Sequence, residues 1–275
     1  MGSDLGSKLL FAVVLVYSLS FFLYLAYIIW PKKLRRGRIA FQILLLGALL
    51  HIVVILQRTI EARHAPFQTL YEALSWFAFW VVVCFLFIEW RRKARLPGLI
   101  ITALAVGACL YALLGLSPGI RPLPPALQSF WFVWHVAFGF ASYALFANAF
   151  ALDISYLSLK DGQRYNLNGP DIQSLHRLAY KLILFGFPLH TFCLASGAFW
   201  AQAAWGTYWG WDPKETWTLI TWLVYALYLH ARVSPRWTGR SSSYLNVLGF
   251  ACVIITFVGV NWLTKLLRIP SIHTF

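Results

Sequence analysis

Eight long runs of apolar residues, separated by short polar and basic segments, constrain the fold of this chain more than any other feature. Each run is close to the roughly 20 residues that an α-helix needs to cross a bilayer. Unpaired backbone groups are not tolerated in hydrocarbon, and the runs lack the alternating pattern of a transmembrane barrel. The sequence therefore predicts an all-α, polytopic transmembrane helical bundle. We expect spans at about 9–30, 39–57, 70–90, 97–115, 129–151, 179–200, 214–232 and 244–266.

Composition supports this fold class. Hydrophobic residues make up 60% of the chain and charged residues only 12%, which is too apolar for a surface that faces water. The first run is long enough to span and its basic cluster follows it, so we interpret it as a retained helix and not as a signal peptide. We expect residues 1–275 to form a single integral membrane domain with no soluble domain.

The distribution of basic residues among the loops predicts the orientation of the chain in the membrane. Most of the 23 Lys and Arg residues lie in the loops after the first, third, fifth and seventh spans, and such loops face the cytoplasm. Both termini are then expected on the outer side, periplasmic or lumenal. The net charge of +14 is thereby explained as a topology signal, and we expect no nucleic-acid partner. The polar stretch 153–174 is predicted to be a cytoplasmic loop, with His176 solvated beside it.

The four cysteines all fall inside apolar runs, and no two of them form CxxC or CxxCH. The sequence therefore predicts neither a thiol oxidoreductase nor a haem bound covalently to this chain.

The densest chemical signal lies between the sixth and seventh runs, in an external loop at about residues 201–215. Asp212, Pro213 and Glu215 have the spacing of a helix start. One interpretation is therefore that the two acidic residues cap this helix. An aromatic interface belt explains only part of the crowding of rings in this short loop. A flat apolar ligand such as a porphyrin explains the cluster better. The rings are those of Trp205, Tyr208, Trp209 and Trp211.

The segment WGTYWGWDPKETWTLITW resembles the tryptophan-rich "WWD" signature of the CcsA (ResC) type cytochrome c biogenesis proteins of system II. The resemblance extends through YALYLHAR, GVN near the C-terminus, and the earlier HAPFQTLYE, so it covers the chain from about residue 51 to the end. A related signature occurs in other haem-handling proteins, but the DPKETW continuation favours CcsA.

This resemblance implies a set of site residues. The family presents haem b, as a bound substrate, on the outer face, where the tryptophan segment including Asp212 holds the porphyrin. The implied axial ligands of the iron are His135 and His273, and the predicted topology places both on the outer side. His230, at the inner end of the seventh span, is implied to bind a second haem that enters from the cytoplasmic half. His51 is placed along the same route.

The remaining histidines carry weaker expectations. We interpret His190, inside the sixth span, as a packing residue, because a lone membrane histidine can be neutral and hydrogen-bonded. His64, beside Pro66, could cap a helix or line the haem site. Arg58, Arg63, Arg121 and Lys214 are outer-side cations that could pair with haem propionates.

The expected function is that of the haem-handling subunit of a cytochrome c synthase (haem lyase) complex, which attaches haem to CxxCH apocytochromes by thioether bonds. The expected partners are a CcsB/ResB-type membrane protein, apocytochrome c, haem and membrane lipid, in a bacterial inner membrane or a thylakoid membrane. Two alternatives stay open. One is a haem exporter without ligation chemistry, and the other is a b-type electron carrier using His51 and His64, which are thirteen residues apart.

Overall fold

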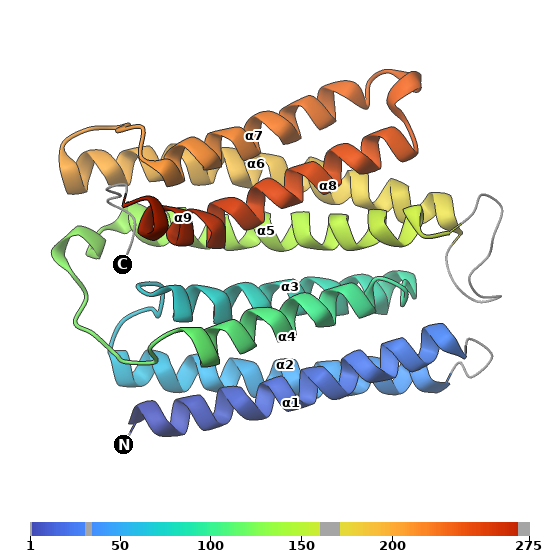
Figure 1. Ribbon diagram of the computed structural model, residues 1–275, viewed down its shortest axis with the longest axis horizontal. Helices are drawn as coiled ribbons and strands as arrows, with labels where there is room; N and C mark the ends of the chain where they lie inside the picture. The colour runs from blue at the N-terminus through green and yellow to red at the C-terminus, as the bar shows by residue number, and fades with distance from the viewer. Residues whose placement is uncertain (1, 31–34, 160–170, 269–275) are drawn as a thin grey trace. The chain divides into compact units, whose positions relative to one another are not determined.

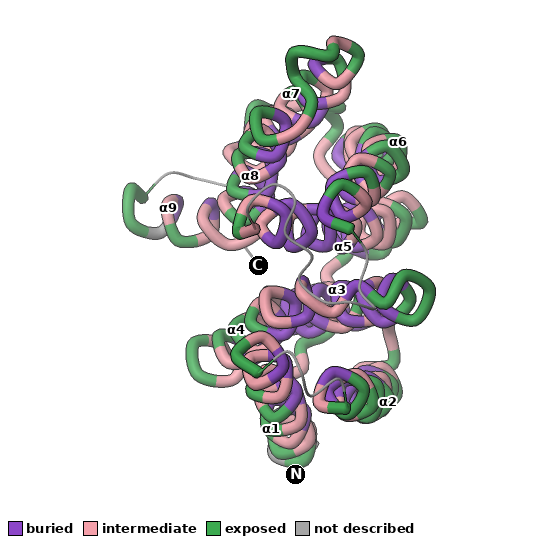
Figure 2. The backbone as a smooth tube through the Cα atoms, turned by 90° about the vertical axis from the view of Figure 1, so that its right-hand side faces the viewer, coloured by how far each residue is buried: buried purple, intermediate pink, exposed green. Residues whose placement is uncertain are grey.

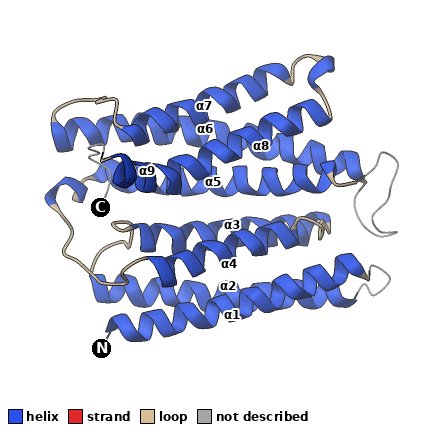
Figure 3. Ribbon diagram, viewed as in Figure 1, coloured by secondary structure: helices blue, strands red, loops and turns tan. Residues whose placement is uncertain are grey.

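The computed structural model describes residues 2–30, 35–159 and 171–268, and within these residues it contains helices and no strand (Figures 1 and 3). The predicted all-α class is confirmed. The long helices are α1 (Gly2–Ile29), α2 (Arg35–Ala62), α3 (Leu70–Arg92), α4 (Gly98–Gly115), α5 (Phe130–Leu157), α6 (Ile172–Trp205), α7 (Pro213–Ala231) and α8 (Arg240–Ile254). The shorter ones are η1 (Pro125–Leu127), η2 (Pro235–Trp237), η3 (Ile255–Gly259) and α9 (Val260–Leu267).

Every predicted span corresponds to a helix. Among the described residues, seven segments are long and apolar enough to cross a membrane: α1 to α6, and the stretch Arg240–Thr264 that runs from α8 through η3 into α9. Helix α7 is 19 residues long but is not among the seven, since it carries charged and hydroxyl side chains in its first turns. The chain is an integral membrane protein by this criterion, and the sidedness of its ends stays a prediction.

The chain divides into two compact units, each of which is described by itself. Unit 1 comprises Met1–Leu123 and Ser158–Leu175, and unit 2 comprises Pro124–Leu157 and His176–Phe275. In unit 1, α1 packs on α2 and α4, and α3 packs on the same two helices. In unit 2, α8 packs on both α5 and α7. Figure 2 shows that buried residues follow the helices on their inward faces, most densely along α5.

In unit 1, ion pairs hold both ends of α3. At its start, Thr69 and Glu72 form a capping box, and the Glu72 carboxylate also accepts a hydrogen bond from Arg58 Nε at 2.8 Å. At its end, Glu89 lies 3.4 Å from Arg95 Nε and accepts a hydrogen bond from the Tyr24 hydroxyl. Both carboxylates are buried, so removal of either partner would leave an uncompensated buried charge.

The structure corrects the prediction for the segment 153–174. Helix α5 continues to Leu157 and α6 already begins at Ile172, so the connection is shorter than expected; residues 160–170 lie outside the described residues. His176 is a member of α6 and is 3% exposed, so the expectation that it is solvated was wrong. The reason is that neighbouring polar side chains satisfy its two ring nitrogens.

These neighbours form a buried network at the end of unit 2 where α5, α6 and α8 meet. His176 Nδ1 lies 2.8 Å from Asp153 Oδ1, and His176 Nε2 accepts a hydrogen bond from Arg232 Nη1 at 2.9 Å. Asp153 also accepts from Ser243 at 3.0 Å and from Asn246 at 2.8 Å. Because Arg232 can only donate, the imidazole carries its proton on Nδ1 and connects the carboxylate to the guanidinium. The network fixes the turn between α7 and α8.

The ion pair at the start of α3 gives a stability prediction. Glu72→Gln leaves the Arg58 guanidinium without its carboxylate in a largely buried position, and we expect a loss of about 3 kcal/mol in unfolding free energy. Thermal unfolding of the purified protein in detergent measures this as a lower Tm. The matched control is Glu61→Gln, which removes an exposed carboxylate on α2 and should leave the Tm nearly unchanged. Equal Tm values for the two variants would contradict the account.

Candidate functional site

The tryptophan-rich loop lies in unit 2, between the end of α6 at Trp205 and the start of α7 at Pro213. The predicted helix cap is confirmed. The Asp212 side chain accepts a hydrogen bond from the Lys214 amide at 2.9 Å. Glu215 Oε2 accepts from the amides of Asp212 at 3.2 Å and of Gly210 at 2.8 Å. The two carboxylates therefore fasten the end of the loop onto the first turn of α7.

Two rings of this loop are held largely exposed. Trp211 is 70% exposed and Tyr208 is 56% exposed, while Trp209 packs edge-on against Trp211 with ring centroids 5.8 Å apart. Trp211 has a φ of 55°, a left-handed conformation that a bulky residue adopts only at a cost of about 1–3 kcal/mol. The capping bonds on either side of Trp211 maintain this conformation, which turns an apolar ring outward. Strain of this kind is typical of binding sites.

The other end of the loop joins a second aromatic group on α6. Trp205 packs edge-on against Trp200, with centroids 4.8 Å apart. Tyr208 contacts Phe199 at 6.1 Å, and Phe199 in turn stacks on Trp131 of α5 at 4.8 Å. The loop rings are thus continuous with rings from the end of α6 and the start of α5.

His135 belongs to this aromatic group. Its imidazole lies nearly parallel to the Trp200 ring, with centroids 5.7 Å apart and an interplanar angle of 28°. Its Nδ1 lies 2.9 Å from the carbonyl oxygen of Cys193 in α6. A backbone carbonyl only accepts, so Nδ1 carries the proton and the lone pair resides on Nε2. This is the arrangement that orients a histidine for ligation of a metal through Nε2.

Three features that position His135 were not predicted from the sequence: the Cys193 carbonyl, the Trp200 ring and the small size of Gly197. A Cβ atom added at Gly197 would lie 2.7 Å from His135 Nδ1. Trp200 is itself fixed, because its indole N–H donates to the Ala126 carbonyl at 2.7 Å. All three depend on the pairing of α5 with α6, which a linear pattern does not specify.

His230 lies apart from this group. It is exposed in the last turn of α7. At 1.5 Å per helical residue, about 27 Å of helix separates it from Asp212. A ligand at His230 would therefore be a different molecule from one held by the tryptophan loop.

The other predicted histidines have protein partners. His51, fully buried in α2, has Tyr17 at 3.2 Å from Nδ1 and Ser75 at 2.9 Å from Nε2, so a role for it in haem passage stays a prediction that would require one bond to break. His64 follows the end of α2, and its Nε2 lies 3.4 Å from the Arg121 carbonyl. His190 is fully buried, and its Nε2 lies 3.4 Å from the Thr218 carbonyl. His273 lies outside the described residues.

Comparisons with known proteins decide the family. Residues 41–268 match the family described as Cytochrome C assembly protein. The chain belongs to this family. A cytochrome c biogenesis protein CcsA of Guillardia theta is 34% identical, over 95% of this chain and 94% of its own length. The CcsA of a Picosynechococcus species is 34% identical, over 76% of this chain and 80% of its own length. The resemblance read from the sequence is therefore confirmed.

A solved structure shares the fold. The chain of a cytochrome c haem lyase, CcmF, superposes with a TM-score of 0.73 at 16% sequence identity. The match covers 93% of this chain and 46% of the other, so this chain spans about half the length of that protein. The family match gives a protein of cytochrome c assembly, and the seven apolar segments among the described residues give an integral membrane protein.

The close approach at Gly197 gives a prediction. Gly197→Ala forces the His135 ring off the Cys193 carbonyl and away from Trp200, although Ala by itself favours a helix by about 0.5–1 kcal/mol. We expect faster carbethoxylation of His135 by diethyl pyrocarbonate, read by mass spectrometry. The matched control is Gly107→Ala in α4, where the added methyl group meets open space. Equal His135 reactivity in both variants would show that Gly197 does not position the ring.

Proposed function

We propose that this chain is the haem-handling subunit of a cytochrome c synthase, and that it holds haem at the outer membrane face for attachment to apocytochromes. Membership of the cytochrome c assembly family supports a role in this pathway. The relatives, which are CcsA proteins, and the structural neighbour, a cytochrome c haem lyase, support haem as the molecule handled.

The observation that carries the proposal is the placement of His135. Its Nδ1–H is fixed on the Cys193 carbonyl, its ring is stacked on Trp200, and Trp200 also contacts Trp205 of the tryptophan loop. An imidazole oriented for ligation of a metal and a broad aromatic surface are thus joined through one side chain. Planar aromatic faces suit a porphyrin, and an imidazole with its lone pair on Nε2 suits haem iron.

The residues of the tryptophan loop would have different roles in holding the haem. Trp211 and Tyr208, which are largely exposed, would contact the porphyrin, with Trp205 and Trp209 behind them. Asp212 is 7% exposed and occupied as a helix cap, so its contribution would be to hold Trp211 in its left-handed conformation.

We propose His273 as the second axial ligand, opposite His135, on the basis of the family resemblance. Two imidazoles would keep the iron saturated until the histidine of an apocytochrome CxxCH segment displaces one of them. His230, at the far end of α7, would bind a separate haem in the inner half of the membrane, and His51 would lie along that route.

The bound substrate would be haem b, whose vinyl groups react with the two cysteine thiols. In each addition an S–C bond forms, the C=C double bond becomes single and the thiol proton ends on the neighbouring carbon. No external oxidant or reductant is needed for this balance. The chain's contribution is to fix the plane of the haem, which turns a bimolecular encounter into an oriented one.

We further propose that the chain forms one membrane domain and works with a CcsB/ResB-type membrane protein, and that the two proteins together act on apocytochrome c. The membrane would be a bacterial inner membrane or a thylakoid membrane, and the tryptophan loop would face the periplasm or the lumen. Relatives from cyanobacteria support this placement.

The ligand assignment is tested by His135→Ala. Loss of an axial ligand should reduce the haem that copurifies, measured by Soret absorbance, by at least about tenfold. Added imidazole should restore the band, because it can occupy the vacated position. The matched control is His190→Gln, a buried histidine of α6 that we interpret as a packing residue. Unchanged haem in His135→Ala would remove this residue as a ligand.

Synthase and exporter differ in their product. Coexpressed with its partner and an apocytochrome, the chain should yield holocytochrome c, detected by haem staining in a denaturing gel. Trp211→Ala should lower this yield severalfold, since a stacked aromatic pair contributes about 1 kcal/mol. Trp237→Ala, an exposed tryptophan of η2, serves as control. Free haem outside the membrane without any holocytochrome would favour an exporter.

A further inference from the structure

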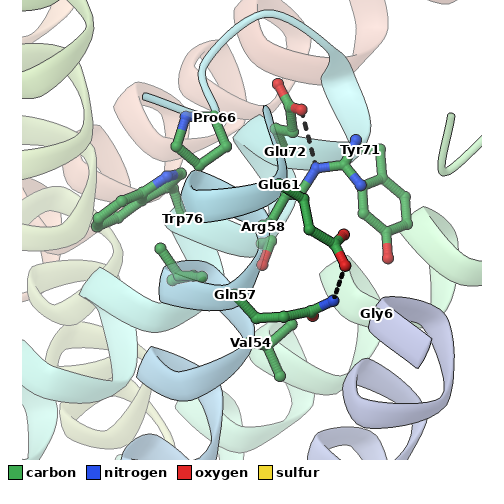
Figure 4. Close-up of a pocket in the computed structure, with 11 residues that line it drawn as sticks. Gly6, Val54, Gln57, Arg58, Glu61, Pro66, Tyr71, Glu72 and Trp76 are labelled. Atoms are coloured by element: carbon green, nitrogen blue, oxygen red, sulfur yellow. Dashed lines mark hydrogen bonds and ion pairs between the residues drawn. The ribbon is translucent and has the colours of Figure 1, made fainter. Parts of the chain in front are cut away.

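The two ends of unit 1 differ in how their charges are balanced. At the end where α2 finishes and α3 begins, acidic side chains accept hydrogen bonds from their neighbours. Glu72 accepts one from Arg58 at 2.8 Å, and Glu61 accepts one from the Gln57 amide at 2.8 Å (Figure 4). At the opposite end, where α1 and α3 finish and α2 and α4 begin, cations are in excess. The predicted orientation puts this second end on the cytoplasmic side.

Six cations lie at this end, around the α1–α2 and α3–α4 connections. The described residues there, 26–30, 35–40 and 86–101, include a single acid, Glu89, which is buried and lies 3.4 Å from Arg95. The cations are Arg35, Arg36 and Arg38 of α2, and Arg91, Arg92 and Lys93 at the end of α3; all but Arg36 are exposed. Arg35, Arg38 and Arg92 have no hydrogen-bond or ion-pair partner among the described residues. Their positive charge is therefore available to an anion.

Arg95 brings the two connections together. A Cβ atom added at Gly37, in the first turn of α2, would lie 2.6 Å from Arg95 Cδ, so the Arg95 side chain lies directly against that turn. Its guanidinium carbon is 5.7 Å from the centre of the Tyr27 ring, in the last turn of α1. Helix α1 also packs on both α2 and α4. The cations that follow α1 and those that follow α3 therefore belong to one group.

Two helix starts add to the positive potential of this group. Helix α2 begins at Arg35 and α4 begins at Gly98, and neither has an acidic residue in its first turn. The start of a helix carries a partial positive charge, which an acid there would neutralise. Helix starts and guanidinium groups are both common partners of phosphate. The chemistry at this end therefore favours a phosphate group.

Aromatic side chains place the cations at the depth of lipid headgroups. Trp30, directly after α1, is 54% exposed, and the Arg36 guanidinium lies 4.9 Å from the centre of its ring. Trp90, near the end of α3, is 58% exposed and has Arg91 at 5.6 Å. Exposed tryptophans at the ends of spanning helices lie at the membrane interface. Exposed apolar side chains on α1 lead towards Trp30 at helical spacing: Leu15, Leu19, Phe22 and Ile29. This placement favours a phosphate carried by acyl chains over one free in water.

We propose that this end of unit 1 binds the headgroup of an anionic phospholipid. Arg35, Arg38 and Arg92, the guanidinium groups without a protein partner, donate to its phosphate oxygens. The acyl chains lie along α1, and the other cations attract the lipid over a longer range. The bound lipid lowers the repulsion between the cations of the two connections. The site is independent of the haem site, because all of its residues belong to unit 1.

The proposal is tested by native mass spectrometry of the full-length protein reconstituted with equimolar phosphatidylglycerol, phosphatidylcholine and phosphatidylethanolamine. We expect phosphatidylglycerol to be retained about tenfold above the other two, in which an ammonium group compensates the phosphate charge. Inorganic phosphate, which has no acyl chains, should not displace it at equal concentration. Equal retention of the three lipids, or displacement by inorganic phosphate, would overturn the proposal.

Paired substitutions assign the preference to this site. Arg38→Gln together with Arg92→Gln should reduce it to less than about twofold. Arg38→Lys together with Arg92→Lys keeps both charges and should preserve the preference within about twofold, which separates loss of charge from damage to the fold. The matched control is Lys181→Gln together with Arg236→Gln, which removes two exposed cations of unit 2 and should leave the preference unchanged. An equal loss in both glutamine pairs would show that the preference follows the net charge of the protein, and would contradict the site.

Discussion

The hydrogen bond from His135 Nδ1 to the Cys193 carbonyl is the interaction on which the functional account depends. It joins α5 to α6, selects the tautomer of the imidazole and, with Trp200 stacked on the ring, fixes its plane. A carbonyl inside a helix can accept a second donor only where side chains leave room for it. Gly197 leaves that room, so the absence of a side chain on one helix orients a histidine on another.

Around this bond, the ends of the tryptophan loop in unit 2 are held by contacts, while its middle is exposed. The Asp212–Glu215 cap and the Trp200–Trp205 contact hold the two ends of the tryptophan loop, while Trp211 stays largely exposed in a strained conformation. At the far end of α7, the bond between His176 and Arg232 fixes the turn that follows His230. Helix α7 thus connects two firmly held ends about 27 Å apart.

The sequence predicted what local chemistry determines. The helices were predictable because each apolar run is long enough to cross a bilayer. The start of α7 was predictable because Asp212, Pro213 and Glu215 form its cap and first turn and contact only nearby residues in the sequence. Contacts between helices were not predictable, because periodicity does not say which helices pair. His176 was therefore placed in solvent, although Asp153 and Arg232 satisfy it in the interior. The role of the Cys193 carbonyl was not predicted for the same reason. Every residue has a backbone carbonyl, so the residue type does not show which one a side chain will contact.

The most direct measurement of the central claim is an experimental structure of the protein loaded with haem, together with its partner. The account predicts iron within bonding distance of His135 Nε2, the porphyrin against Trp211 and Tyr208, and His135 Nδ1 still on the Cys193 carbonyl. Iron bound elsewhere, with His135 turned away from the tryptophan loop, would contradict it.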